Sequence, residues 1–467
     1  PIKSSAASDV YKRQDISCMN RDRIDFGKEK IGPLFKAIFI PTLIGMIFNT
    51  ALTVIDGIFV GQGVGADGIA AVNIVAPVFM VCTGIGLMLG IGSSVVASIR
   101  LASDNVKAAR IIMTQAFIVG TIVLGAICLA FLLFPKGVVY ALGCSQRLED
   151  YAMDYLLWLL PGLVFLYFEC VGMMLIRLDG SPRFAMWIQV TAAVVNIILD
   201  WYMIFPLGMG VKGAAMATSI ACMIGGLMVL GYFFRFHKVL SFYRLKVSAK
   251  SFMLTVRNTW YMVKIGFATF LTELAMSVMM LTGNYMFMSM LHEDGVAAFA
   301  VACYLFPLVF SISNAVAQSA QPIISFNYGA RYMDRVRKTL RLSVMTAIVC
   351  GALITFGLWM GAGTVTSLFL SPDSEAYILA KQGLPLYAVC AVFFAINIAM
   401  IGYYQSIEKA LPSTVYTLLR GIVLLVPIFI LLPRIIGVPG LWLAIPVAEM
   451  LTSVIIVTIY LLRSRSH

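Results

Sequence analysis

The chain has 467 residues, of which 61% are hydrophobic and only 12% are charged. A soluble domain carries about 25% charged residues, so this composition excludes an ordinary soluble protein and predicts an all-α polytopic membrane protein. The formal net charge of +12 points to nucleic acid only if the basic residues lie away from the membrane-crossing segments.

The first segments of the chain are a polar tail and a series of apolar windows. Residues 1–26 lack the apolar segment of a signal peptide, so we expect a flexible cytoplasmic tail in which the residues before Met19 need not be native. Twelve mostly apolar windows follow, each long enough to cross a bilayer, at 34–60, 68–97, 112–134, 152–176, 184–205, 213–234, 264–291, 296–326, 342–370, 376–404, 411–433 and 438–462.

The basic residues are distributed unevenly between the loops. With the N-terminus in the cytoplasm, 28 of the 34 Lys and Arg residues are cytoplasmic, 5 are outside and Arg420 is within a span. The positive-inside rule requires this asymmetry. The charge therefore reports topology and attraction to the lipid bilayer, and we expect no nucleic-acid partner. We expect a multi-pass protein of the cell inner membrane with both termini cytoplasmic.

A short internal repeat relates the two halves of the chain. "DGIAAV" begins at Asp67 and "DGVAAF" at Asp294, and the same 227 positions separate "GAAMA" at Gly213 from "GLWLA" at Gly440. Six spans per half is an even number, so both halves keep one orientation. The sequence predicts 12 transmembrane helices in two six-helix lobes related by a pseudo-two-fold axis along the membrane normal, an architecture of alternating-access transporters.

One long polar segment between the sixth and seventh spans sets the expected domain boundaries. We predict an N-terminal lobe over 27–236, a cytoplasmic linker over 237–262 and a C-terminal lobe over 263–467.

Five carboxylates lie inside predicted spans, at Asp56, Glu169, Asp200, Glu273 and Glu449. Each costs about 2.5–3.5 kcal/mol at the bilayer centre, so each should face a partner or a water-reachable cavity.

Two of these carboxylates have polar neighbours at helical spacing. Asn49, Thr53 and Asp56 share one face of the first span, and Asn196 and Asp200 lie one turn apart in the fifth. If the two faces met, their oxygens would form either a Na⁺ site or a pair of carboxyl groups that exchange a proton. The residues do not choose between these ions, and helix capping by each Asp is the simpler alternative.

A second polar set lies in the seventh and eighth spans, where we predict contacts with substrate. Its members are Glu273, Asn284, Gln318 and Gln321. Glu273 has no basic residue at matching depth, so it requires a proton or a cationic substrate. The two glutamines belong to a seam that either lines a cavity or joins helices by hydrogen bonds.

Other function classes lack their motifs. The chain has three His residues, all near loops or the C-terminus, and no phosphate-binding glycine loop, so we expect neither an enzyme nor a bound cofactor. Composition alone does not exclude a channel. A lipid or lipid-linked oligosaccharide flippase would be expected to have a more basic central cavity than these mainly acidic intramembrane charges provide.

Four segments together resemble the multidrug and toxic compound extrusion (MATE) family of bacterial type. They are "NTALTVIDGIFVGQGVGADGIAAVNIVAPV" (49–78), "RLDGSPRFAMWIQVTAAVVNIILD" (177–200), "GVKGAAMATSI" (210–220) and "QSAQPIISFNYGARYMDRVRK" (318–338). The resemblance implies two lobes around a V-shaped cavity, and export of small organic cations or drugs by a secondary antiporter in exchange for H⁺ or Na⁺.

The resemblance also implies an ion-coupling cluster in the N-terminal lobe, made of Asp56, Asn196, Asp200 and Thr218, which would be metal ligands only if Na⁺ is the coupling ion. Another branch of the family uses a Glu in the seventh span, matching Glu273, with an Asp in the tenth. The tenth span here has no carboxylate, so we assign coupling to the N-terminal lobe and leave Glu273 to the cationic substrate.

The expected mechanism is alternating access by a functional monomer. Ion binding at the cluster would bend the first span, where Pro41 and Gly45 are weak points, and lower the affinity for substrate.

Overall fold

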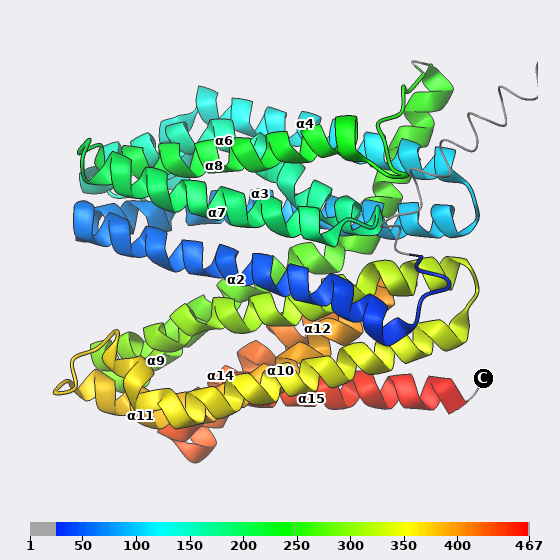
Figure 1. Ribbon diagram of the computed structural model, residues 1–467. Coiled ribbons are helices and arrows are strands. Elements are labelled where there is room, and N and C mark those ends of the chain that lie inside the picture. The colour runs from blue at the N-terminus through cyan, green and yellow to red at the C-terminus, as the bar shows by residue number, and fades with distance from the viewer. Residues whose placement is uncertain (1–24, 247, 466–467) are drawn as a thin grey trace, which may run out of the picture.

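The computed structural model describes residues 25–246 and 248–465. All regular elements in these two ranges are helices. Within lipid, an α-helix satisfies the hydrogen bonds of its backbone N–H and C=O groups internally. They form two groups that lie close together at the end marked by the C-terminus and diverge toward the other end (Figure 1).

The first lobe consists of six long helices and three short ones. Their bounds are α2 (Ile31–Gly63), α3 (Ala66–Ala102), α4 (Val106–Leu133), α5 (Pro135–Ala141), η1 (Gln146–Leu148), α6 (Glu149–Leu178), α7 (Pro182–Ile204), α8 (Gly210–Gly231) and η2 (Tyr232–Phe236).

The second lobe is divided into elements differently. Its elements are α9 (Ala249–Gly329), α10 (Met333–Ser367), α11 (Glu375–Ala388), α12 (Cys390–Ser406), α13 (Ala410–Leu418), η3 (Leu419–Val423), α14 (Leu425–Ile436) and α15 (Val438–Arg465). The elements α11 and α12 together make one span, as do α13, η3 and α14.

Helix α9 contains two spans. Eleven helical stretches of the described chain are long and apolar enough to cross a membrane, and α9 is by far the longest of them. Its helical geometry breaks at His292, where φ is 54° and ψ is −148°. This break lies between the predicted seventh and eighth spans. Counting α9 twice gives twelve spans, so the predicted fold class is confirmed.

Local sequence sets several helix ends. The side chains of Asn105, Ser248 and Ser374 accept hydrogen bonds from backbone N–H groups in the first turns of α4, α9 and α11, which satisfies donors that a helix start leaves free. Gly65 and Gly437 take positive φ between α2 and α3 and between α14 and α15. A side chain at either position would strain the backbone.

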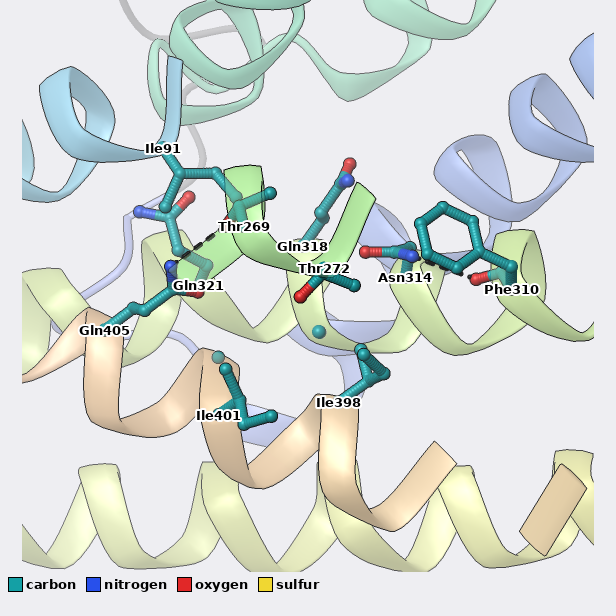
Figure 2. A pocket seen from close by; sticks show the side chains of 12 residues that line it. Ile91, Thr269, Thr272, Phe310, Asn314, Gln318, Gln321, Ile398, Ile401 and Gln405 are labelled. Atoms are coloured by element: carbon teal, nitrogen blue, oxygen red, sulfur yellow. Dashed lines mark hydrogen bonds between the residues drawn. The ribbon is translucent and has the colours of Figure 1, made fainter. Parts of the chain in front are cut away.

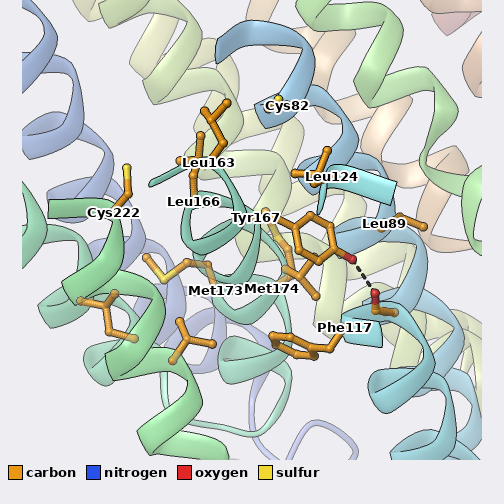
Figure 3. Close-up of a cluster of buried hydrophobic side chains, with 14 of the residues drawn as sticks. Cys82, Leu89, Phe117, Leu124, Leu163, Leu166, Tyr167, Met173, Met174 and Cys222 are labelled. Carbon is orange, nitrogen blue, oxygen red and sulfur yellow. Dashed lines mark hydrogen bonds between the residues drawn. The ribbon is translucent and has the colours of Figure 1, made fainter. Parts of the chain in front are cut away.

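The core of the first lobe lies between α3, α4, α6 and α8. Tyr167 of α6 is fully buried there, and its hydroxyl donates a 2.5 Å hydrogen bond to the carbonyl oxygen of Ala116 (Figure 3). Leu163, Leu166 and Met174 surround it. The hydrogen bond lets a phenol occupy an apolar core without an unsatisfied hydroxyl.

Small residues allow the two lobes to approach closely. A Cβ atom at Gly92 of α3 would collide with the backbone of Met262 in α9, and one at Gly266 of α9 would collide with the backbone of Met88 in α3. The collisions are reciprocal, so the α3 and α9 backbones touch at this crossing. Contacts of this kind hold membrane helices together where the hydrophobic effect cannot.

The expected tail and linker are only partly covered. Residues 1–24 of the tail lie outside the described residues, whereas Phe26 is buried and packs on Phe326 with ring centroids 5.8 Å apart. In the linker, α9 begins at Ala249, so the second part of this polar segment is helical and continues directly into the seventh span.

Candidate functional site

The carboxyl groups of Asp56 on α2 and Asp200 on α7 lie within hydrogen-bonding reach of each other. Asp200 is fully buried, and its Oδ2 accepts a 2.7 Å hydrogen bond from the Asn196 amide nitrogen. Its Oδ1 and the Oδ1 of Asp56 are buried without a partner among the described residues. The predicted meeting of the two helix faces is therefore present at these three residues.

Two ionised carboxylates have only acceptor atoms, so they repel each other in direct contact. A shared proton or a bound cation removes this repulsion and also satisfies the buried oxygens. In the described chain, no cluster of three or more His, Cys, Asp or Glu side chains could hold a metal ion. The unpartnered buried oxygens of the pair could hold either a shared proton or a cation between the two carboxyl groups.

The remaining neighbours of the pair were only partly foreseen. Thr218, assigned to this cluster from the family resemblance, is half-buried on α8, and its role stays a prediction. Tyr155 of α6 is buried and lies near enough to Asp56 and Asp200 for their charges to act on its hydroxyl. No feature of the sequence singles out Tyr155, because a Tyr within an apolar run is usually a packing residue.

The rest of the predicted polar face of the first span points elsewhere. Asn49 and Thr53 are exposed although Asp56 is half-buried. Helix α2 packs on α7 and α9 along a narrow stripe, and these two residues lie outside it. Gln189 of α7 lies against Gly45, where a Cβ atom would collide with its amide, so the suggested weak point in α2 is a contact with the helix that carries Asp200.

A separate cavity of about 30 Å³, lined by both apolar and polar side chains, lies in the second lobe near its contact with α3, with room for about two water molecules. Figure 2 shows its polar lining, which comes from α9 and α12: Thr269, Thr272, Asn314, Gln318, Gln321 and Gln405. The Gln405 amide donates to the Thr269 hydroxyl at 2.9 Å and to the Ile265 carbonyl at 3.1 Å. Gln318 and Gln321 are thus brought together, as their spacing predicts.

The other two predicted substrate residues lie away from this cavity. Glu273 follows Thr272 by one position, and the helical rotation per residue turns it toward Gly84 of α3. It is half-buried and makes no hydrogen bond or ion pair within the described residues. Asn284 is exposed three turns farther along α9. The four residues therefore do not form one cluster.

Hydrogen bonds join the lobes along the eighth span. Arg177 of α6 donates a 2.8 Å hydrogen bond to Oε1 of Gln318, and the Ser94 hydroxyl of α3 donates to Gln321 at 3.3 Å. Nearer the middle of the molecule, Thr50 of α2 lies 2.7 Å from the hydroxyl of Ser311. The polar seam thus both lines a cavity and joins the lobes, which were the two alternatives for it.

A buried ion pair lies inside the second lobe. Arg420 in the π-helical turn η3 contacts Glu449 of α15 at 3.0 Å, and both residues are 4% exposed. Asn397 donates to the same carboxylate at 2.7 Å, and the Phe394 ring lies 4.3 Å from the guanidinium carbon. Glu449, for which the sequence indicated no role, is therefore neutralised by the one basic residue predicted within a span.

The MatE family model matches residues 41–202 and 268–431, one stretch in each lobe. The chain belongs to the MatE family. This confirms the resemblance drawn from the four segments. MATE proteins are transporters, so the protein is a multi-pass membrane transporter and not an enzyme.

Individual relatives agree with this MATE assignment. The FAD transporter of Shewanella oneidensis is 26% identical over 448 residues, which cover 93% of this chain and 95% of the relative. The multidrug export protein MepA of Staphylococcus haemolyticus is 26% identical over 440 residues, covering 92% and 94%. An outward-facing multidrug resistance MATE transporter has the same fold, with a TM-score of 0.85 at 24% identity over 92% of this chain and 94% of that one.

Proposed function

We propose that this MATE protein exports organic cations, including drugs, in exchange for H⁺ or Na⁺ moving inward. The observation that carries the proposal is the contact between Asp56 and Asp200, with one buried oxygen of each unpartnered. A carboxyl pair inside a membrane span needs a positive charge between its members, and that charge is what a cation gradient supplies.

Ion binding acts on the contact between α2 and α7. With a proton or Na⁺ between Asp56 and Asp200, the two helices are held together; without it, the carboxylates repel each other. Helix α2 also packs on α9 and is linked to it by Thr50 and Ser311. A change at the pair therefore reaches the contact between the lobes. If the ion binds the inward-open and outward-open states with affinities that differ by a few kcal/mol, its binding is enough to exchange the populations of these two states.

Two features support a cationic substrate. Glu273 has a half-buried carboxylate without a basic partner in the described chain, and the MepA relative is named as a multidrug exporter. The Shewanella relative is an FAD transporter, which favours an anionic dinucleotide as the second candidate. Glu449 neutralises Arg420, which leaves Arg177 as the single buried cation of the described spans without a carboxylate partner. We therefore rank this candidate lower.

The test is efflux from proteoliposomes under a pH gradient and, separately, under a Na⁺ gradient. We expect export of a fluorescent organic cation to be saturable and to respond to one of the two gradients. Asp200→Asn and Asp56→Asn should abolish that response, while Asp67→Asn, which alters an exposed carboxylate paired with Arg147, should retain it.

Three results would contradict the proposal. Gradient-driven export that is unchanged in both Asp56→Asn and Asp200→Asn would remove the carboxyl pair from coupling. Conduction without saturation would indicate a channel, and export of FAD but of no cation would indicate the second candidate.

A further inference from the structure

The first turns of α9 have a polar and an apolar side, and their arrangement is the reverse of that in a surface helix of a soluble protein. Their polar side faces the protein, because the Gln115 amide of α4 donates to the Thr255 hydroxyl at 2.9 Å and accepts from the Asn258 amide at 2.9 Å. Their apolar side faces outward.

We call this outward side the apolar stripe, and it consists of Phe252, Met253, Val256 and Trp260. These side chains are 53% to 74% exposed, and at 3.6 residues per turn they fall within about one third of the helix circumference. Four adjacent large apolar side chains exposed to water would be an aggregation liability. The stripe therefore needs an apolar partner.

A row of cations borders the stripe. We call it the basic edge, and it consists of Lys250, Arg257 and Lys264, all exposed and all within the neighbouring sector of the helix. An apolar stripe with Lys and Arg along its side is the pattern of helices that lie in the headgroup region of an anionic membrane. The exposed Phe234 and Phe236, at the start of the same connecting segment, flank another exposed cation, Arg235.

The position of these turns fits that partner. From Ala249 to the break at His292, α9 is about twice as long as the roughly 20 residues that cross the hydrocarbon core. In Figure 1 its first turns project from the first lobe at the end of the molecule that holds the C-terminus, and they run obliquely to α4, α6 and α8. The same helix then enters the membrane, so its first turns lie at the membrane boundary.

We propose that the apolar stripe inserts into the boundary between headgroups and acyl chains, and that the basic edge binds the phosphates of anionic lipids in the same leaflet. The partner is the lipid surface itself, because the stripe and its cations share one side of a helix that is already anchored in that leaflet. A second copy of the chain or a soluble protein would cover the stripe without needing the basic edge.

The test uses the full chain in nanodiscs and the fluorescence of Trp260, obtained as the difference between wild type and Trp260→Phe. We expect lipids brominated near the headgroup end of their acyl chains to at least halve this signal, and aqueous iodide to leave most of it. Trp359, exposed on the predicted ninth span, provides the positive control for quenching by lipid through Trp359→Phe.

The anionic lipid requirement is tested by varying the fraction of phosphatidylglycerol. The quenching of Trp260 should increase with that fraction, and Lys250→Gln with Arg257→Gln should remove at least half of the increase. Arg341→Gln, which removes an exposed cation from α10, should not. Quenching of Trp260 by iodide but not by brominated lipid, equal quenching in purely zwitterionic nanodiscs, or protection only at protein concentrations that give dimers would each overturn the proposal.

Discussion

Arg177 of α6 and Gln318 of α9 connect the two lobes through a 2.8 Å hydrogen bond between a buried guanidinium and a side-chain amide oxygen. Arg177 is 2% exposed, and no carboxylate lies within ion-pair distance of it in the described chain. Its other hydrogen-bond partner, the Met174 sulfur at 3.5 Å, is also neutral, so the buried charge is incompletely compensated. Its environment is therefore sensitive to any movement between the lobes.

Gln318→Glu should strengthen this contact, because the new carboxylate would face the Arg177 guanidinium. We expect the state in which the lobes touch here to be favoured by about 1.4 kcal/mol and cation export to slow by about tenfold. Thermal unfolding and export rates measure the two effects. Gln321→Glu is the matched control, since its partner Ser94 is neutral; equal slowing in both variants would disprove the pairing.

Glu273→Gln should weaken recognition of cationic substrate while the response to the ion gradient persists. The carboxylate has no cationic partner in the described residues, so its charge is available to a substrate. Export measured against substrate concentration should show KM raised about tenfold for a monovalent cation. Glu293→Gln changes an exposed carboxylate on the same helix and should leave KM unaltered.

Arg420→Met should destabilise the protein by about 3–5 kcal/mol, because it leaves Glu449 charged and buried without its partner. Replacing both residues by Met should recover most of that loss. Chemical unfolding in detergent measures both. The exposed pair of Arg147 and Asp67 is the control, and Arg147→Met should cost less than about 1 kcal/mol.

Gly266→Val should separate α3 from α9, because any side chain there collides with the backbone of Met88. We expect a large loss of folded protein together with loss of export, measured by size-exclusion chromatography and efflux. Gly125→Val on α4 is the control, since no atom lies within 4 Å of its added Cβ. A normal yield of active Gly266→Val would show that this crossing is not close.

Lys136 on α5 has a raised pKa, because its ammonium lies 2.8 Å from the Glu149 carboxylate. A raised pKa for a cation means that the pair stabilises the fold below the usual Lys pKa, and that this contribution is lost as the pH rises through the raised value. The ¹³C NMR signal of methylated Lys136 should titrate above those of other exposed lysines. Glu149→Gln should abolish the difference.

Hydropathy and charge predicted the fold well because both are set by the bilayer. Each predicted window coincides with a helix, with half of α9 or with a run of consecutive shorter helices. In the sequence, only a short polar interval indicates the break at His292. Nothing in the sequence indicates the π-helical turn that carries Arg420. Both depend on tertiary packing that a single sequence does not display.

The candidate site was predictable where chemistry and helical spacing agree. Asp56, Asn196 and Asp200 are ionisable or polar in apolar surroundings, and each must have a compensating neighbour. Tyr155 was not predictable, because its position near the pair depends on how α6 packs beside α7. The pairing of Arg420 with Glu449 could have been predicted, because opposite charges in adjacent spans can neutralise each other within the membrane.

The Gln115 side chain forms hydrogen bonds with both Thr255 and Asn258. The beginning of α9 is therefore packed on the first lobe, although the same helix continues into the second lobe. If the polypeptide were produced as two separate pieces cut just before α9, the later piece would still display its docking turns for the earlier one. The two halves of the chain are therefore joined at this place by side-chain hydrogen bonds as well as by the connecting backbone.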